Sequence, residues 1–215
     1  MKASSQKKSI LVWDLPVRVF HWLLVISFAG AWLTSESETQ QMIHYAFGYS
    51  ACALVLFRII WGIVGTRYAR FTQFIKGPAE TIGHIKSLFT GNQHPGLGHN
   101  PAGALAMVSL MFLILLTCVT GYWIIKEVLD DVMGEVHEAT ASLALVVVVI
   151  HVAAAIFMSF LHKENLIRPM VTGKKQGLQH RAIRYPMYSV GIGLALAWAY
   201  FFYLVVSGSL PGLTQ

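Results

Sequence analysis

Charged residues are scarce in this chain, since only 12% of its 215 residues are Asp, Glu, Lys or Arg and 55% are hydrophobic. Soluble domains carry about 25% charged residues, so a soluble protein of this composition would expose a large apolar surface. The mean hydropathy of +0.58 points the same way. The composition therefore predicts an integral membrane protein.

Cysteine is nearly absent, with only Cys52 and Cys118, each inside an apolar run. The chain has no Cys-x-x-Cys-His motif, so we do not expect a covalently attached c-type haem. We expect the two thiols to be packing residues, with a disulfide as the less favoured alternative. The first apolar run is not followed by an A-x-A-like site, and we therefore expect no cleavable signal peptide.

Long apolar runs are what the chain does have. A bilayer crossing takes about 20 apolar residues in a helix. An isolated apolar segment in lipid must be helical, because a helix satisfies its own backbone hydrogen bonds. We predict an all-α membrane fold with five transmembrane helices at 17–34, 42–64, 101–124, 137–160 and 186–207.

Basic residues are missing from alternate connections between these runs. The first connection contains Glu36 and Glu38 and no basic residue, and the connection at 125–136 contains four acidic residues against Lys126. Lys and Arg gather instead at the amino terminus and at 65–100 and 161–185. Cytoplasmic loops carry such an excess, so we predict a cytoplasmic amino terminus and a periplasmic carboxyl terminus. The net charge of +6 then reflects topology, and no nucleic-acid partner is expected.

Two histidines, His137 and His151, bracket the apolar segment ATASLALVVVVI and lie fourteen residues apart. Fourteen residues rise about 21 Å along a helix and make nearly four turns, so both imidazoles leave the same helix face. Ionisable residues inside a membrane are costly and usually functional. Histidine is a common axial ligand of haem iron, and the spacing therefore predicts two stacked haems.

The predicted topology sorts four histidines into two pairs. His44 and His137 fall at the outer end of their helices and can share an outer haem, and His21 and His151 can share an inner haem. The alternative is that single histidines snorkel to the interface or bond to a neighbouring helix. His162 is an alternative inner ligand. The other histidines lie in connections, where they are expected to be solvated: His84, His94, His99 and His180.

Arg58 is the one basic residue placed well inside a predicted span, since Arg18 lies one residue after the start of the first span. Its guanidinium could pair with a propionate of the inner haem, or it could snorkel to the headgroups. Arg18 and Arg67 are weaker candidates for the propionate. Gly48, four residues after His44, would leave room for a porphyrin edge, although membrane helices also use small residues simply to pack.

Several segments resemble one protein family. WDLPVRVFHW (13–22) resembles the start of bacterial cytochrome b561 and of the b-type cytochrome subunit of nickel-iron hydrogenases. IHYAFGYSACALVLFRIIWG (43–62) resembles the second helix of that family, and VHEATASLALVVVVIHVAAAIF (136–157) resembles its fourth helix. GHNPAGALAMV (98–108) and HKENLIRPMVTG (162–173) resemble the entry to the third helix and the exit from the fourth, so the likeness covers roughly residues 10 to 175.

The resemblance implies a four-helix bundle in the bacterial inner membrane that holds two non-covalent b haems. Its four ligands carry over to His21, His44, His137 and His151. We therefore expect a diheme domain at 1–175 and, at 176–215, a basic connection with an additional carboxyl-terminal transmembrane helix. This fifth helix departs from the family pattern and could pack on the bundle or dock a partner subunit.

The resemblance also implies electron transfer between the quinone pool and a periplasmic partner, either a c-type cytochrome or a hydrogenase-like oxidoreductase. We therefore expect an electron-transfer subunit of an oxidoreductase in preference to a self-contained enzyme. His99 and Asn100 could bond to a quinone carbonyl, but Asn100 could equally cap a helix before Pro101. One alternative is a stand-alone superoxide:quinone oxidoreductase, which the acidic outer connections disfavour because superoxide is an anion. Another is a non-redox transporter.

Overall fold

The computed structural model describes residues 8–75, 77, 79–80, 82–83, 86, 98, 101–210 and 212. Within these residues, five helices are long and apolar enough to cross a membrane. They are α1 (Leu15–Leu33), α2 (Gln41–Val64), α4 (Pro101–Ile125), α5 (Asp130–Leu161) and α7 (Tyr188–Val206). The predicted all-α, five-helix membrane fold is confirmed.

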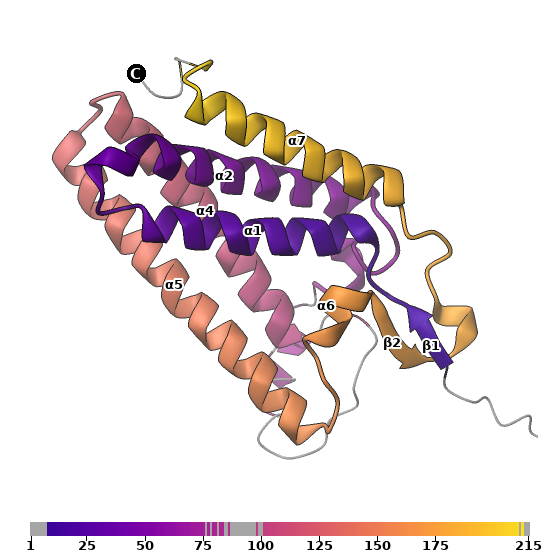
Figure 1. The fold of residues 1–215 in the computed structure, drawn as a ribbon. Coiled ribbons are helices and arrows are strands. Elements are labelled where there is room, and N and C mark those ends of the chain that lie inside the picture. Colours follow the sequence, from indigo (N-terminus) through magenta and orange to yellow (C-terminus); the bar gives the residue numbers. More distant parts are fainter. Residues whose placement is uncertain are drawn as a thin grey trace, which may run out of the picture.

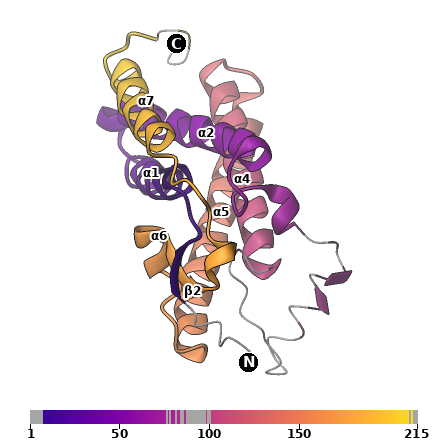
Figure 2. The same cartoon turned by 90° about the vertical axis from the view of Figure 1, so that its right-hand side faces the viewer.

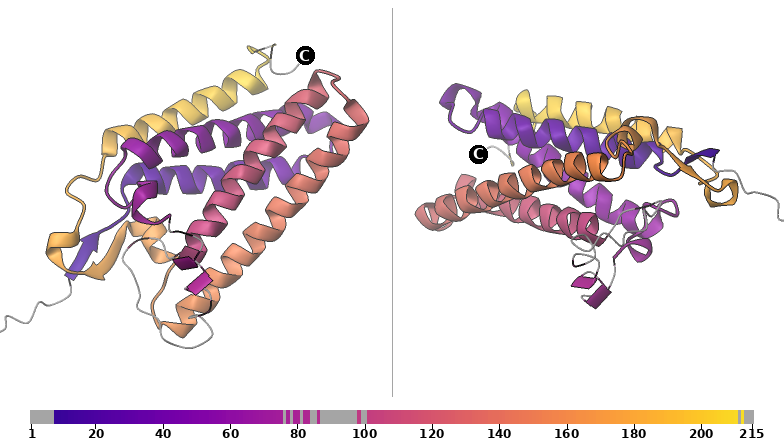
Figure 3. Two further views of the ribbon diagram at one scale, coloured as in Figure 1. Left: turned by 180° about the vertical axis from the view of Figure 1, so that it is seen from behind. Right: turned by 90° about the horizontal axis from the view of Figure 1, so that it is seen from below.

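The helices form two layers (Figures 1 and 3). Helices α1, α2 and α7 pack side by side, while α4 and α5 pair with each other and lie at an angle to the first layer. The turn between α1 and α2, the turn between α4 and α5, and the carboxyl end of α7 all lie at the same end of the bundle. We name this the outer end, after the predicted topology, and the opposite end the inner end.

Helix α5 is longer than the apolar stretch predicted at 137–160, because it begins at Asp130. The added turns carry Asp131 and Glu135, and acidic residues near a helix amino terminus interact favourably with its dipole. The 32 residues of α5 span about 48 Å at about 1.5 Å per residue. The helix therefore exceeds a hydrocarbon core of about 30 Å, even when tilted.

Helix α7 packs on the bundle, as one of the two alternatives for the fifth span expected, and its docking to a partner subunit stays a prediction. It contacts α1 and α2 along its length. The Trp198 indole donates a hydrogen bond of 3.0 Å to the buried hydroxyl of Ser27 on α1. The Phe202 ring lies 4.7 Å from the Phe47 ring of α2, centroid to centroid.

A small antiparallel sheet, absent from the sequence prediction, closes the inner end (Figure 2). Strand β1 (Lys8–Leu11) pairs with β2 (Lys174–Gly177), which follows the short helix α6 (Arg168–Thr172). The Gly173 carbonyl accepts hydrogen bonds from the amides of Val12 and Trp13 at 2.8 and 3.0 Å. Gly173 itself has φ +76, and a Cβ there would lie 2.6 Å from the Trp13 carbonyl, so glycine is required. The predicted boundary between the diheme domain and the carboxyl-terminal segment, after residue 175, falls inside strand β2.

Asp14 connects the start of α1 to the end of α2. Its carboxylate is 1% exposed and caps α1 by accepting a hydrogen bond of 2.9 Å from the amide of Val17. It also accepts hydrogen bonds from the Trp61 indole at 3.0 Å and the Thr66 hydroxyl at 2.6 Å. One buried side chain thus satisfies three donors from two helices and a connection.

Replacing Asp14 with alanine should destabilise the fold. The substitution leaves three donors without an acceptor, and each buried unsatisfied donor costs about 1–3 kcal/mol. We expect a lower midpoint of thermal unfolding for the detergent-solubilised protein, with a smaller loss for Asp14→Asn, which keeps one oxygen. An unchanged midpoint in Asp14→Ala would contradict this role.

Candidate functional site

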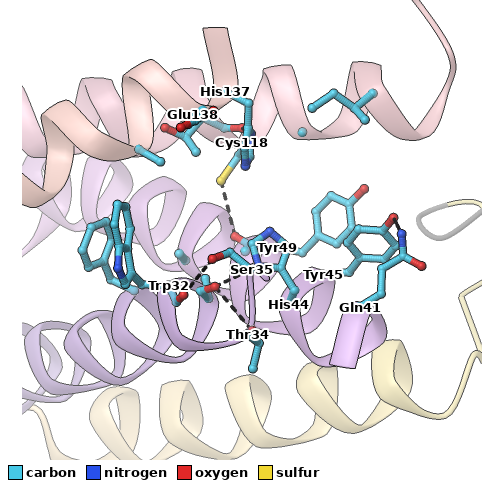
Figure 4. A pocket seen from close by; sticks show the side chains of 18 of the residues that line it. Trp32, Thr34, Ser35, Gln41, His44, Tyr45, Tyr49, Cys118, His137 and Glu138 are labelled. Atoms are coloured by element: carbon cyan, nitrogen blue, oxygen red, sulfur yellow. Dashed lines mark hydrogen bonds between the residues drawn. The ribbon is translucent and has the colours of Figure 1, made fainter. Parts of the chain in front are cut away.

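A cavity of about 950 Å³ lies at the outer end between the two helix layers. Sites for small molecules and cofactors occupy about 300–1,000 Å³. His44 of α2 and His137 of α5 line this cavity from opposite sides, and Figure 4 shows their side chains pointing toward one another across it. The structure therefore brings the predicted outer pair together.

The two imidazoles are spaced as two ligands of one ion would be. Their ring centroids are 6.2 Å apart, with 63° between the ring planes. A bond from a metal to an imidazole nitrogen is about 2 Å long. Because the ring centre lies about 1 Å behind that nitrogen, two rings on one ion have centroids about 6 Å apart. The observed pair fits axial ligation of a haem iron.

Each imidazole is oriented by a backbone carbonyl of a neighbouring helix. His44 Nδ1 lies 2.8 Å from the carbonyl oxygen of Ala31 on α1, and His137 Nδ1 lies 2.9 Å from that of Thr117 on α4. A carbonyl can only accept, so Nδ1 carries the proton in both rings. Nε2 is then left with its lone pair, which is the usual arrangement for a histidine that ligates a metal.

His137 is held further by α4, through residues that the sequence analysis missed. The hydroxyl of Thr120 lies 3.3 Å from His137 Nδ1, and a Cβ on Gly121 would lie 3.0 Å from Cε1 of the same ring. The one available signal was the cluster Thr117, Thr120 and Gly121, which gathers polar and small residues within one turn of an apolar helix.

Gly48 leaves open space in the wall of the cavity. A Cβ built on it would meet no atom within 4 Å, so this side of the cavity has room for a flat macrocycle. The Cys118 thiol donates to the Gly48 carbonyl at 3.3 Å. Both cysteines are free, as predicted.

The inner pair consists of His21 on α1 and His151 on α5. His21 Nδ1 is buried and has no hydrogen-bond partner among the residues that the structure describes. Buried polar atoms are normally satisfied, so this orphaned nitrogen fits a site that is completed by a bound group. His162, the alternative ligand, caps the inner end of α5.

Arg58 does not snorkel, because its side chain is only 1% exposed. Its Nη2 donates to the Ala69 carbonyl at 2.9 Å, and its guanidinium carbon lies 5.0 Å from the Phe71 ring centre. Its Nη1 is buried and has no partner within the described part of the chain. Arg58 follows His44 by fourteen residues (58 − 44 = 14), which puts it on the same face of α2 at the inner level. The free Nη1 fits an anionic group there.

Other basic side chains near the inner end make contacts of their own, although the buried Nε of Arg18 also has no hydrogen-bond partner within the described residues. Arg18 donates to the Val171 carbonyl at 2.6 Å, and the Arg67 guanidinium lies 5.6 Å from the Tyr68 ring centre. Burial lowers the pKa of Lys175, an effect that the nearby Glu164 carboxylate opposes. The predicted quinone contacts, His99 and Asn100, lie outside the described residues.

Membrane helices that present paired imidazoles at a cofactor-sized cavity are the architecture of a membrane cytochrome. Residues 12–173 match the family described as prokaryotic cytochrome b561. This match covers well over half of the chain, and the protein belongs to that family. It is therefore a multi-pass membrane cytochrome that binds haem b and takes part in electron transport.

Curated relatives carry one common name. The chain is 21% identical to a probable Ni/Fe-hydrogenase B-type cytochrome subunit of Rhodobacter capsulatus, over 81% of this chain and 84% of the relative. It is 22% identical to the protein of the same name from Rhizobium leguminosarum, over 79% and 90%. A probable Ni/Fe-hydrogenase 1 B-type cytochrome subunit of Escherichia coli K12 is 26% identical, over 54% and 60%.

Filling the open space beside Gly48 should displace the outer cofactor. In Gly48→Leu the new side chain would occupy the cavity, and we expect the ratio of haem to protein, measured by absorbance, to fall. Gly193→Leu is the matched control, because Gly193 of α7 also has open space around it and does not line the cavity. Full haem content in Gly48→Leu would mean that the cofactor lies elsewhere.

Proposed function

We propose that this cytochrome carries electrons across the bacterial inner membrane through two bis-histidine b haems. His44 and His137 would hold the outer haem, and His21 and His151 the inner one. The observation that carries the proposal is the outer pair, with its 6.2 Å spacing and its two Nδ1 atoms bonded to carbonyls. Bound haem supplies a one-electron couple, and the protein supplies the ligands, the burial and the local charge that set its potential.

The inner haem is proposed from the geometry of α5 and from two buried atoms at the inner level that lack hydrogen-bond partners among the described residues. His151 follows His137 by fourteen residues on one continuous helix, so it presents its imidazole on the same face about 21 Å deeper. The unpartnered atoms His21 Nδ1 and Arg58 Nη1 would be satisfied there. We assign Arg58 to a propionate, because guanidinium matches a carboxylate in shape and charge.

We further propose that the partners are quinone in the membrane and an oxidoreductase or c-type cytochrome on the periplasmic side. The relatives are named as hydrogenase cytochrome subunits, which supports an oxidoreductase partner. The outer cavity is lined by Glu36, Glu38 and Glu138, and such an acidic rim suits a basic protein partner. The same rim would repel superoxide and so weighs against the stand-alone superoxide:quinone oxidoreductase.

The ligand assignment predicts separable losses. We expect His151→Ala to lose the inner haem and keep the outer one at least in part, and His44→Ala to do the reverse. Spectra of the reduced proteins and haem-to-protein ratios measure both. His162→Ala is the control and should keep both haems. Unchanged haem content in His151→Ala would refute the inner assignment, and loss in His162→Ala would favour the alternative ligand.

The charge pattern predicts that the carboxyl terminus is periplasmic. A phosphatase reporter that is active only in the periplasm should be active when fused to the carboxyl terminus, and a reporter that needs the cytoplasm should be inactive. The opposite pattern of reporter activity would mean that the end named outer faces the cytoplasm and the end named inner faces the periplasm.

A further inference from the structure

We infer that the inner end of α5 carries a binding site for an anionic phospholipid. The site is a groove of about 310 Å³, formed by the last turns of α5 and the short connection that leads to α6 (Figure 1). It is separate from the outer cavity, and no proposed haem ligand lines it. A lipid site here goes beyond the proposed electron transfer and shares with it only the predicted orientation, which makes this end face the inner leaflet.

The walls of the groove are apolar. Ile156 and Phe160 of α5 lie one helical turn apart on the same face, and Ile167 lines the groove from the connection. All three side chains are exposed on the surface of the protein, as residues that contact lipid tails would be. The hydrocarbon core ends near the end of an apolar span, so the groove runs from the level of the acyl chains to that of the headgroups.

Two polar residues shape the groove through bonds within the protein. The hydroxyl of Ser159 donates a hydrogen bond of 2.6 Å to the Ala155 carbonyl and accepts one of 3.0 Å from the Leu166 amide. The side-chain oxygen of Asn165 accepts hydrogen bonds of 3.0 and 2.8 Å from two backbone amides at the start of α6. These bonds fold the connection back against α5, and they occupy both side-chain oxygens.

The charged residues of the groove leave one cation unpaired. Lys163 is exposed at the groove, and within the described part of the chain its ammonium makes no hydrogen bond or ion pair. Glu164 also lines the groove, but it lies near a cation of its own, since its carboxylate opposes the lowering of the Lys175 pKa by burial. Lys163 therefore offers a positive charge just beyond the apolar wall, at the level where a lipid phosphate lies.

The surroundings of the groove are basic as well. Positions 161–185 contain six Lys or Arg residues and a single acidic residue, Glu164. Such clusters next to a transmembrane helix attract anionic headgroups. A free phosphate would make no use of the apolar wall, and a zwitterionic lipid would bring a second cation close to Lys163. The combination of wall and cation therefore fits a phospholipid with a net negative headgroup.

A lipid bound in the groove would strengthen a link between the two helix layers. The connection leads into α6, where the Met170 carbonyl accepts a hydrogen bond of 3.1 Å from the Trp22 indole, and the Val171 carbonyl accepts one of 2.6 Å from Arg18. Both donors belong to α1, so α6 joins the end of α5 to the first layer. Binding should therefore raise the midpoint of thermal unfolding.

Titration of the purified, haem-loaded cytochrome in detergent tests the site. Phosphatidylglycerol, phosphatidylcholine and inorganic phosphate are added in separate series, while native mass spectrometry counts bound lipid and thermal unfolding reports stability. We expect phosphatidylglycerol to bind in preference to phosphatidylcholine and to raise the midpoint. Inorganic phosphate at the same concentration should leave the midpoint where it is.

Variants then test the named residues. Lys163→Gln should weaken phosphatidylglycerol binding by about fivefold, the factor for one basic residue near an anionic surface, and Lys163→Arg should preserve it. The matched control is Lys174→Gln, which removes an exposed lysine at the same end that does not line the groove. Phe160→Ala should weaken binding with no change in charge, whereas Phe157→Ala, which removes an exposed ring outside the groove, should not.

Three results would overturn the site. Equal weakening in Lys163→Gln and Lys174→Gln would show that the basic surface as a whole attracts the lipid. Equal binding of phosphatidylcholine would remove the role of headgroup charge, and equal stabilisation by inorganic phosphate would mean that the groove is not needed. Each variant should keep the wild-type ratio of haem to protein, so the haem-binding proposal is tested separately and stands or falls on its own.

Discussion

The outer site depends on where each imidazole places its single proton. Inside lipid an unbonded N–H is costly, and both outer histidines donate theirs to a helix carbonyl. His44 of α2 donates to α1, and His137 of α5 donates to α4. Each helical hairpin therefore orients its own ligand. A metal-bound macrocycle between them would link the two hairpins, which also contact each other directly through α2 and α4.

The inner end is organised by buried polar groups. Asp14 gathers donors from α1, from α2 and from the connection after α2, and the β1–β2 sheet ties the amino terminus to the segment after α6. These contacts fix the start of α1, and hence the height of His21, nearly two helical turns after Asp14. Arg58 is also buried at this end, so its charge is kept from water, whereas a snorkelling arginine would place its charge at the headgroups.

Much of this arrangement could be predicted from the sequence. The five helices followed from apolar length, because a bilayer sets the length of any segment that crosses it. The pairing of His44 with His137 followed from alternating charge and helix periodicity, and the structure places these two rings together. His151 could be assigned to the same face of α5 as His137 because helical geometry is regular.

What could not be predicted depends on contacts between distant segments. The Ala31 and Thr117 carbonyls are backbone groups without a sequence signature, and the β1–β2 pairing joins residues more than 150 positions apart. The WDLP segment was recognised as a family feature, but the three bonds of Asp14 depend on how α2 ends. The early start of α5 was missed because its first turns are acidic, and hydropathy detects the span and not the helix.

The central claim is that four histidines of one chain bind two b haems. A pyridine haemochrome assay on the purified, detergent-solubilised protein, combined with quantitative amino-acid analysis, tests it most directly. The account predicts two haems b per chain, both extracted by acidified acetone because they are not covalently attached. A ratio of one or zero in folded protein, or haem that resists extraction, would contradict it.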